Sequence, residues 1–378
     1  MVPTPSSRRD RRPEALILDP GVLGDGPVCE FQSDLAVAAH GGTVVQPWRD
    51  RFRAAETEGL TVVADGAELA TASQAQVVVH LQKSRAATFA DLQQAWRALE
   101  PGGRLLFVGT NALGVVSAVK RLARQLEQPG IVVSNRAHAR VARFEKRDGP
   151  EPLVEASPDF DVEVESIAGE RHAFRIETLP GVFSAKKLDA GSELLLAALP
   201  RFVAHKPPKR VVDLGCGAGV FGIAAALLWP ETRVLLVDAD ARAVECARRN
   251  IARLGLEARC EVAWWDAREQ PLDSRFDLAL VNPPFHHRGP EVDLGPAFAL
   301  FHSLQQWIKP GARALLVANR TLPYERPLAE IGVFEILRSE RGYKLISLKR
   351  SARSSGARRR SDPGSRSGGS SRAPIRSR

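Results

Sequence analysis

The chain is poor in the residues that build disulfide frameworks, metal clusters and membrane spans. Its 378 residues include four cysteines and one methionine. The cysteines lie far apart without a C-x-x-C pair, which argues against a zinc site or a disulfide framework and predicts a reducing, cytoplasmic location. The longest apolar run, residues 220–229, is well short of the ~20 residues that a membrane helix needs. We therefore expect no metal and no membrane span, and the polar N-terminal segment predicts no secretion.

A strong charge of either sign is also missing from the body of the chain. The formal net charge is +9, but residues 351–378 hold eight arginines against one aspartate, and residues 1–13 hold four against one. Residues 14–350 therefore carry a net charge of −1. The tail at 351–378 is almost free of large apolar side chains, which predicts disorder. Because arginine attracts phosphates, we predict that this tail tethers the protein to nucleic acid, the alternative being a solubilising tail without a partner.

Two halves of the chain alternate short apolar segments with helical spacing, which is typical of a parallel sheet covered on both faces. The sequence LEPGGRLLFV at 99–108 is echoed by IKPGARALLV at 308–317, so we expect a duplicated α/β domain. Strands are expected at 15–18, 43–45, 60–63, 77–81, 105–108 and 131–134, and again at 210–214, 234–238, 260–264, 278–282, 314–318 and 344–348.

The expected organisation is two tandem Rossmann-like domains with basic ends. A disordered N-terminus at 1–13 precedes a first domain at 14–147. A linker rich in proline and acids follows at 148–159. The second domain spans 160–350 and opens with a hairpin at its start, and the arginine-rich tail at 351–378 completes the chain.

A glycine-rich turn follows the first strand of the second half. The sequence VVDLGCGAGVFG runs from an apolar strand at Asp213 through Gly215, Gly217 and Gly219 into an apolar helix. Glycine allows a tight turn and close approach of a ligand, and the helix N-terminus supplies free N–H groups. Asp238 ends the next strand, at the spacing of an acid that accepts hydrogen bonds from ribose hydroxyls. These five residues are therefore predicted to bind a nucleotide-like cofactor.

Two cofactors fit this turn. Residues 217–222 read G-x-G-x-x-G, which predicts an NAD-dependent oxidoreductase. Residues 213–219 read D-x-G-x-G-x-G, the pattern of class I S-adenosylmethionine (SAM) methyltransferases, in which the acid and the loop lie beside the amino-acid end of the cofactor. We favour SAM on the second pattern. A tight turn without a ligand is a third interpretation.

A second motif, Asn282-Pro283-Pro284-Phe285, closes the fourth expected strand of the second half, at the sheet edge where ligands of α/β folds bind. The prolines stiffen the turn and lack N–H donors, which leaves the Asn282 side-chain oxygen and the Pro283 carbonyl as acceptors. Such a pair suits the exocyclic amine of a base, on which Phe285 would stack. We therefore predict that these four residues are catalytic and orient an amine toward the methyl group of SAM. A rigid loop without chemistry is the alternative.

With both motifs, the chain resembles the class I SAM-dependent methyltransferases that modify the N2 amine of guanine in ribosomal RNA, and among them the duplicated-domain bacterial enzymes for the small and large subunits. Residues 179–196, LPGVFSAKKLDAGSELLL, are similar to a segment that precedes the catalytic sheet in that family. The resemblance implies that Phe183 contacts the cofactor and that Ser184, Leu188 and Asp189 lie near the cofactor or the substrate mouth. It also implies a cytoplasmic monomer that uses SAM and acts on ribosomal RNA or a ribosomal subunit.

In that family the N-terminal domain carries no cofactor chemistry, and the first half of this chain agrees. It lacks both motifs, so we expect a degenerate domain that positions RNA or shields the catalytic domain. The expected counterparts are residues 18–24 for the glycine-rich turn, Gln46 or Trp48 for Asp238, and residues 81–84 for the Asn-Pro-Pro-Phe turn.

Weaker candidates follow the third and fourth strands. Asp266 is predicted to accept a hydrogen bond from the adenine amine of the cofactor, and Trp264 or Trp265 to cover the ring, although core packing explains the tryptophans equally well. The remaining candidates are His286 for the target phosphate or base and Lys186 and Lys187 for phosphates, each with a solvent-exposed role as the alternative.

Other functions stay open from sequence alone. Methylation of adenine N6 or of a protein glutamine also uses N-P-P-aromatic turns. An NAD-dependent oxidoreductase and a non-catalytic RNA-binding assembly factor are the remaining alternatives.

Overall fold

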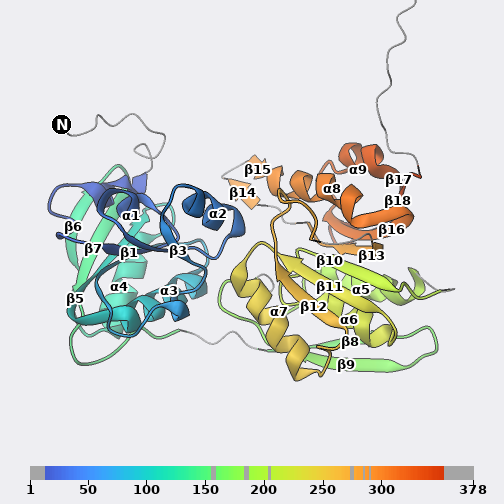
Figure 1. Ribbon diagram of the computed structural model, residues 1–378, viewed down its shortest axis with the longest axis horizontal. Coiled ribbons are helices and arrows are strands. Elements are labelled where there is room, and N and C mark those ends of the chain that lie inside the picture. The colour runs from blue at the N-terminus through green and yellow to red at the C-terminus, as the bar shows by residue number, and fades with distance from the viewer. Residues whose placement is uncertain are drawn as a thin grey trace, which may run out of the picture.

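The structure, a computed structural model, describes residues 13–154, 159–182, 187–202, 206–272, 276–283, 286–288 and 291–352, with only the backbone of those between 286 and 293. It contains two seven-stranded sheets, one in each half of the chain (Figure 1). Their strand orders are β3-β2-β1-β4-β5-β7-β6 and β12-β11-β10-β13-β16-β18-β17. In both sheets the first five strands run parallel to one another, and the sixth strand, β7 or β18, pairs antiparallel with both of its neighbours. The predicted duplication of a Rossmann-like domain is therefore confirmed.

The first domain contains seven strands and four α-helices in its described part. The strands are β1 (Val28–Phe31), β2 (Gly42–Val45), β3 (Thr61–Val63), β4 (Gln74–His80), β5 (Leu99–Thr110), β6 (Ile131–Arg136) and β7 (Ala139–Glu145). The helices are α1 (Leu35–His40), α2 (Arg49–Thr57), α3 (Arg85–Ala98) and α4 (Val115–Gln125), with short 3-10 helices η2 (Pro13–Leu18) and η3 (Gly66–Glu68).

The second domain opens with a hairpin, as expected, and continues with the same β/α alternation. Its strands are β8 (Phe160–Glu165), β9 (Arg171–Ile176), β10 (Arg210–Leu214), β11 (Arg233–Asp238), β12 (Cys260–Trp264), β13 (Phe276–Val281), β14 (His286–Arg288), β15 (Glu291–Asp293), β16 (Ile308–Asn319), β17 (Gly332–Glu340) and β18 (Tyr343–Arg350). The helices are α5 (Ala190–Phe202), α6 (Val220–Leu228), α7 (Ala241–Arg253), α8 (Gly295–Trp307) and α9 (Glu325–Ile331).

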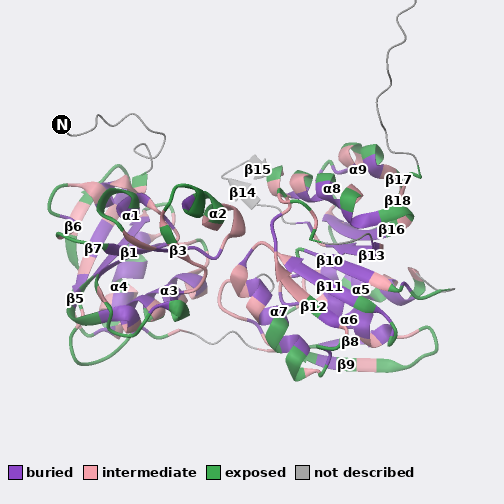
Figure 2. Cartoon of the chain, in the orientation of Figure 1, coloured by how far each residue is buried: buried purple, intermediate pink, exposed green. Residues whose placement is uncertain are grey.

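Each sheet is buried on both faces, which explains why its central strands are mostly apolar. On β10, Val211 packs into the cluster under α5 and α6, and the next residue, Val212, packs into the opposite cluster with α8 and α9. Figure 2 shows these central strands buried and the helices exposed on their outer sides. The polar residues of the candidate site therefore lie at the ends of the strands, where the helices on the two faces leave the sheet uncovered.

Two expectations for the first domain are wrong. Residues 15–18 form the 3-10 helix η2 instead of a strand, since a short apolar run such as Leu16–Ile17 can cover a sheet face as readily as join it. The strand β1 (Val28–Phe31) was missed because Glu30 interrupts its apolar run. That glutamate is nevertheless fully buried. The strand β7, which lies between β5 and β6, and the edge strand β17 of the second sheet were also missed.

Three compositional findings accompany the fold. None of the helices in the described ranges is long and apolar enough to cross a membrane. The same ranges contain no cluster of three or more side chains suited to a metal ion. All four cysteines are buried and free.

Candidate functional site

The glycine-rich turn forms an open cradle between β10 and α6. Gly215, Gly217 and Gly219 have φ angles of +74°, +54° and +90°, a left-handed region that other L-residues rarely adopt. A Cβ atom added to Gly215 or Gly217 would meet no atom within 4 Å, whereas one on Gly219 would lie 3.2 Å from the Leu236 side chain. The first two glycines therefore border free space, and the third allows α6 to pack closely.

Asp213 lies beneath this cradle and is incompletely paired. It is fully buried, and one carboxylate oxygen accepts a hydrogen bond of 2.8 Å from the Gly222 N–H. The other oxygen, Oδ1, has no hydrogen-bond partner in the described part of the chain. Burial raises the pKa of Asp213 to about 7. Because an unpaired buried carboxylate oxygen is costly, a cationic ligand at this place would remove the penalty.

Asp238 ends β11 and holds the same loop from the other side. Its carboxylate accepts hydrogen bonds from the N–H groups of Gly217 (2.8 Å) and Asp240 (2.9 Å). Desolvation by burial raises its pKa to about 6. The two aspartates thus place two carboxyl groups on either side of the glycine cradle, each of which carries a negative charge when it is ionised.

Asn282 lies at the same edge of the sheet as this cradle. Val281 of β13 is paired with Leu214 of β10, so Asn282 and Gly215 both follow residues that are neighbours in the sheet. Neighbouring strands lie about 4.8 Å apart. Sequence reasoning required these two motifs to meet, and the register brings them together. Pro283 is buried, whereas Pro284 and Phe285 lie outside the described residues.

A hydrogen-bond chain orients the Asn282 amide. Its Nδ2 donates to the Ser192 hydroxyl oxygen at 3.3 Å, and that hydroxyl donates to Asp189 Oδ2 at 2.6 Å. Asp189 Oδ1 in turn accepts from the N–H groups of Gly191 and Ser192 at the start of α5. With its amino group directed to Ser192, Asn282 keeps its carbonyl oxygen for a ligand.

Ser192 is the candidate site residue that sequence reasoning missed. The resemblance placed Asp189 near the site, and the signal that could have found Ser192 is its spacing. An aspartate three residues before a serine at a helix start is typical of a local capping arrangement. Of the other candidates, Phe183, Ser184 and Lys186 lie outside the described residues. Lys187 is exposed, and the structure gives only the backbone of His286.

The first domain shows why its corresponding site is degenerate. By strand register, Glu30 occupies the position of Asp213 and His80 that of Asn282. These two side chains bind each other, with 2.7 Å between Glu30 Oε1 and His80 Nε2, and Glu30 also accepts two N–H groups of α1. Asp213 in the second domain is therefore incompletely paired, whereas its counterpart Glu30 in the first domain is fully paired.

The same register corrects the expected counterparts. The turn that follows β1 begins after Phe31, so residues 18–24 do not correspond to the glycine-rich turn. The Asn-Pro-Pro-Phe turn corresponds to a segment beginning at His80, one residue earlier than expected. Gln46 is confirmed as the counterpart of Asp238, and Trp48 is not.

Asp266 is buried after β12, but its carboxylate is bound by Arg268. The backbone N–H, Nε and Nη2 of Arg268 lie 2.9, 2.7 and 2.9 Å from Asp266 oxygens. Trp265 packs in the core against Trp307, with ring centroids 4.8 Å apart, so it does not cover a ligand. Trp264 instead faces the first domain, with Phe52 edge-on at 4.8 Å and Arg49 at 5.0 Å.

The first domain therefore contacts the loops that border the cradle. Arg49, at the start of α2, pairs with Glu269 at 2.7 Å, and Asp50 pairs with Arg268 at 3.0 Å. The backbone joins the domains as well, because Arg49 N–H donates to the Ala239 carbonyl. Figure 1 shows α2 on the side of the first domain that faces the second. Two ion pairs thus fix the segment 266–269 from outside the catalytic domain.

We expect Arg49→Glu to weaken SAM binding roughly three- to tenfold, because it places two carboxylates together and loosens the segment 266–269. The second substitution Glu269→Arg restores the opposite charges and recovers part of the affinity. Calorimetric titration of the full chain measures both. Arg53→Glu is the matched control, since Arg53 pairs with Glu56 inside the same helix. Equal losses for Arg49→Glu and this control would contradict the expectation.

The raised pKa values of Asp213 (about 7) and Asp238 (about 6) predict opposite pH trends for binding and stability. Only the ionised carboxylates attract a cation, so SAM affinity falls as pH drops through 7 and 6, by up to about tenfold per pH unit for each required group. These groups ionise more readily when unfolded, so their contribution to stability is full below about pH 4 and is lost as pH rises to 7.

The substitution Asp213→Asn shows how much of the pH dependence of SAM affinity, and how much of that of stability, comes from the Asp213 carboxyl. Calorimetry and thermal unfolding between pH 5 and 8 measure the two quantities. We expect the variant to bind SAM more weakly and with a flatter pH profile. A wild-type profile retained in the variant would show that Asp213 does not attract the cofactor.

Comparison with known proteins agrees with this geometry. The family model described as the methyltransferase small domain matches residues 173–347. A ribosomal RNA small subunit methyltransferase C of Klebsiella pneumoniae is 31% identical over 291 residues, covering 77% of this chain and 79% of that protein. A ribosomal RNA large subunit methyltransferase G of Shewanella amazonensis is 32% identical, covering 68% of this chain and 64%, under two thirds, of that protein.

A solved structure extends the similarity to both domains. The Thermus thermophilus 16S rRNA N2 G1207 methyltransferase, in complex with AdoMet and guanosine, aligns with a TM-score of 0.77 and 28% identity. The alignment covers 92% of this chain and 94% of that one. From these matches and the two equivalent sheets, the chain belongs to the ribosomal RNA small subunit methyltransferase C family, with its methyltransferase domain in the second half.

Proposed function

We propose that the second domain transfers a methyl group from SAM to the exocyclic N2 amine of a guanine in ribosomal RNA. The observation that carries the proposal is the meeting of two features at one sheet edge. These are a glycine cradle flanked by Asp213 and Asp238, and an Asn282 carbonyl oxygen oriented by Ser192. The similar enzymes named above act on ribosomal RNA, and one of them is solved with guanosine.

The residues present fit SAM. The unpaired Oδ1 of buried Asp213 suits a cationic group, and the space beside Gly215 and Gly217 leaves room for a ligand against the backbone. Asp238 would accept hydrogen bonds from the ribose hydroxyls. Asp266 would accept a hydrogen bond from the adenine amine after Arg268 releases one of its hydrogen bonds to that carboxylate. When bound, SAM supplies a methyl group already activated by its sulfonium.

The chain's own residues prepare the amine. The lone pair of a base amine is delocalised into the ring, which makes the nitrogen a weak nucleophile. Two acceptors, the Asn282 side-chain oxygen and the Pro283 carbonyl, would bind its two hydrogens and fix the direction of the nitrogen. Phe285 would stack on the flipped base. Neither a metal nor a strong base is needed, because the proton can leave after transfer.

Mapping of base methylation in ribosomal RNA from cells that lack the protein tests this proposal. We expect one guanine to lose its N2-methyl group, and the same RNA to be methylated again by the purified chain with SAM. An unchanged methylation map, or loss of a methyl group from adenine, would contradict the proposal.

A further inference from the structure

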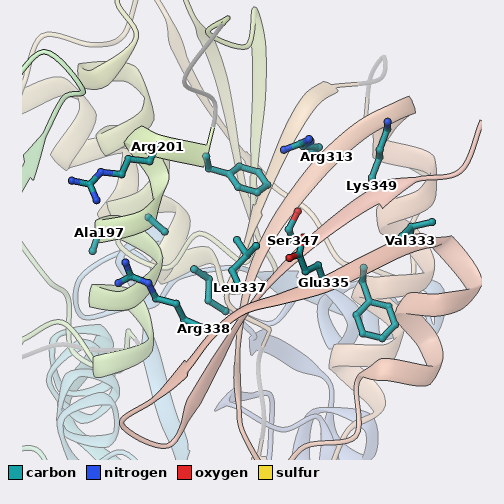
Figure 3. A pocket seen from close by; sticks show the side chains of 13 residues that line it. Ala197, Arg201, Arg313, Val333, Glu335, Leu337, Arg338, Ser347 and Lys349 are labelled. Carbon is teal, nitrogen blue, oxygen red and sulfur yellow. The ribbon is translucent and has the colours of Figure 1, made fainter.

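A groove on the second domain lies away from the methyl-transfer edge and has no role in the site described above. It has a volume of about 570 Å³ and runs between the C-terminal half of α5 and the antiparallel strands β17 and β18. Figure 3 shows α5 on one side and the two strands on the other, with Leu337 and Ser347 between them. The strand β17 is the edge of the sheet, so its outer side has no neighbouring strand.

The pattern of β18 explains which side chains enter the groove. Its residues alternate between the two faces of the sheet. Ile346 and Leu348 pack into the core with α8 and α9, whereas Ser347 and Lys349 line the groove. On β17 a register shift between Ile336 and Arg338 interrupts the alternation. Such a bulge redirects side chains, and here both Leu337 and Arg338 line the groove.

The groove is strongly basic in a domain body that is otherwise near neutral. Arg201, Arg313, Arg338 and Lys349 line it together with the single acid Glu335, which gives a formal charge of +3. All four cations are exposed. In the described part of the chain, none of them makes an ion pair. Unneutralised cations on both walls of one groove fit an anionic occupant.

The floor of the groove is apolar. Leu337 and Val333 are 39% and 75% exposed, so their apolar surfaces are open to an occupant. Phe202 also lines the groove, with Arg313 lying 5.6 Å from its ring centroid. Cations along the walls and apolar or aromatic groups on the floor suit a single-stranded nucleic acid, whose phosphates and bases need both kinds of contact.

The groove is joined to the methyl-transfer site by one helix. Ser192, which binds Asn282, lies in the first turn of α5, and Arg201 lies at its end. At 1.5 Å per residue the two are about 14 Å apart along the helix axis. At the other end of the groove, the Ser351 N–H, just after β18, donates to the Ile331 carbonyl oxygen. The arginine-rich sequence beyond residue 352 has the same sign of charge as the groove, so its charge does not suit it as the occupant.

We infer that this groove binds the single-stranded phosphate backbone of the RNA substrate, beyond the guanine that enters the methyl-transfer site. The inference rests on the proposed function for the identity of the RNA. The phosphates contact Arg201, Arg338 and Lys349, and the ribose or base edges contact Leu337 and Val333. The groove thus positions the RNA strand, whereas Asn282 takes part in the methyl transfer.

The test compares two double charge reversals in the full chain. Arg201→Glu with Arg338→Glu changes the groove. Lys120→Glu with Arg124→Glu makes the same charge change on exposed positions of α4 in the first domain. Binding of a ribosomal RNA fragment is measured by fluorescence anisotropy at several salt concentrations, and SAM affinity by calorimetry.

The groove variant should bind RNA roughly tenfold more weakly, with the slope of log K against log salt smaller by about 1.4, or about 0.7 per lost phosphate contact. Its SAM affinity should equal that of the wild type. Ultraviolet crosslinking to 4-thiouridine RNA should label peptides containing residues 197–202 or 333–338 in the wild-type chain. This second measurement does not depend on any variant folding.

RNA binding equal to the wild type, or equally weakened in the α4 control, would overturn the inference, as would crosslinks confined to other peptides. Unchanged RNA binding together with binding of an acidic peptide would assign the groove to a protein. The result is distinguishable from failure of the proposed function. If the wild-type chain methylates no guanine but still loses RNA binding on groove reversal, only the proposed reaction fails.

Discussion

Asn282→Ala should reduce methyl transfer about a hundred- to a thousandfold while leaving SAM affinity unchanged, an effect comparable to removing one polar group that acts in a transition state. The side-chain oxygen of Asn282 is held toward the ligand side because its amino group binds Ser192. Alanine leaves the amine with one acceptor and no fixed direction. Single-turnover kinetics with saturating RNA separate this loss from weaker binding.

Asn319→Ala is the matched control for this experiment. Asn319 also ends a strand of the same sheet, but it accepts hydrogen bonds from Thr321 in its own turn. We expect near wild-type transfer from this variant. If both asparagine variants lost activity equally, general disturbance of the strand ends would explain the result, and the role assigned to Asn282 would be wrong.

Gly215→Val should lower SAM affinity by roughly a hundredfold or more. The residue has a φ of +74°, and its Cβ would project into space that no other atom occupies within 4 Å. A branched side chain there costs about 1–2 kcal/mol of backbone strain and also fills the proposed place of the cofactor. Isothermal titration measures the affinity, and thermal unfolding measures the strain.

Gly311→Val separates these two contributions. Gly311 has a φ of +79° and the same open surroundings, but it lies in the Pro-Gly turn within β16, away from the glycine-rich turn. We expect both variants to unfold at similarly lowered temperatures and only Gly215→Val to lose SAM. Equal retention of SAM in both variants would show that the cradle does not hold the cofactor.

The duplicated fold could be predicted from sequence because apolar strands and Pro-Gly turns are local signals. The strand at residues 210–214 and the one at 260–264 are confirmed with their bounds as β10 and β12. The missed strand β1 shows the limit. Its buried Glu30 is stable only because His80 and two N–H groups of α1 bind it, and these partners lie elsewhere in the sequence.

The candidate site could be predicted only in part, for the same reason. Glycines and prolines are typical of unusual backbone conformations, so the sequence alone indicated both the glycine-rich turn and the Asn-Pro-Pro-Phe turn. Ser192 carries only the weaker signal of its spacing from Asp189, and its proposed role depends on a contact with Asn282 across 90 residues. The ion pairs of Arg49 and Asp50 with the segment 266–269 join two domains, and no pattern within either domain predicts them.

The most direct measurement incubates the purified chain and ribosomal RNA with SAM labelled on its methyl group, then digests the RNA to nucleosides and separates them by liquid chromatography with mass spectrometry. The geometry of Asn282 and the glycine cradle predicts that the label elutes as N2-methylguanosine and that Asn282→Ala reduces the rate at which this signal appears about a hundredfold or more. Label in N6-methyladenosine or in protein, or an undiminished signal from the variant, would contradict the account.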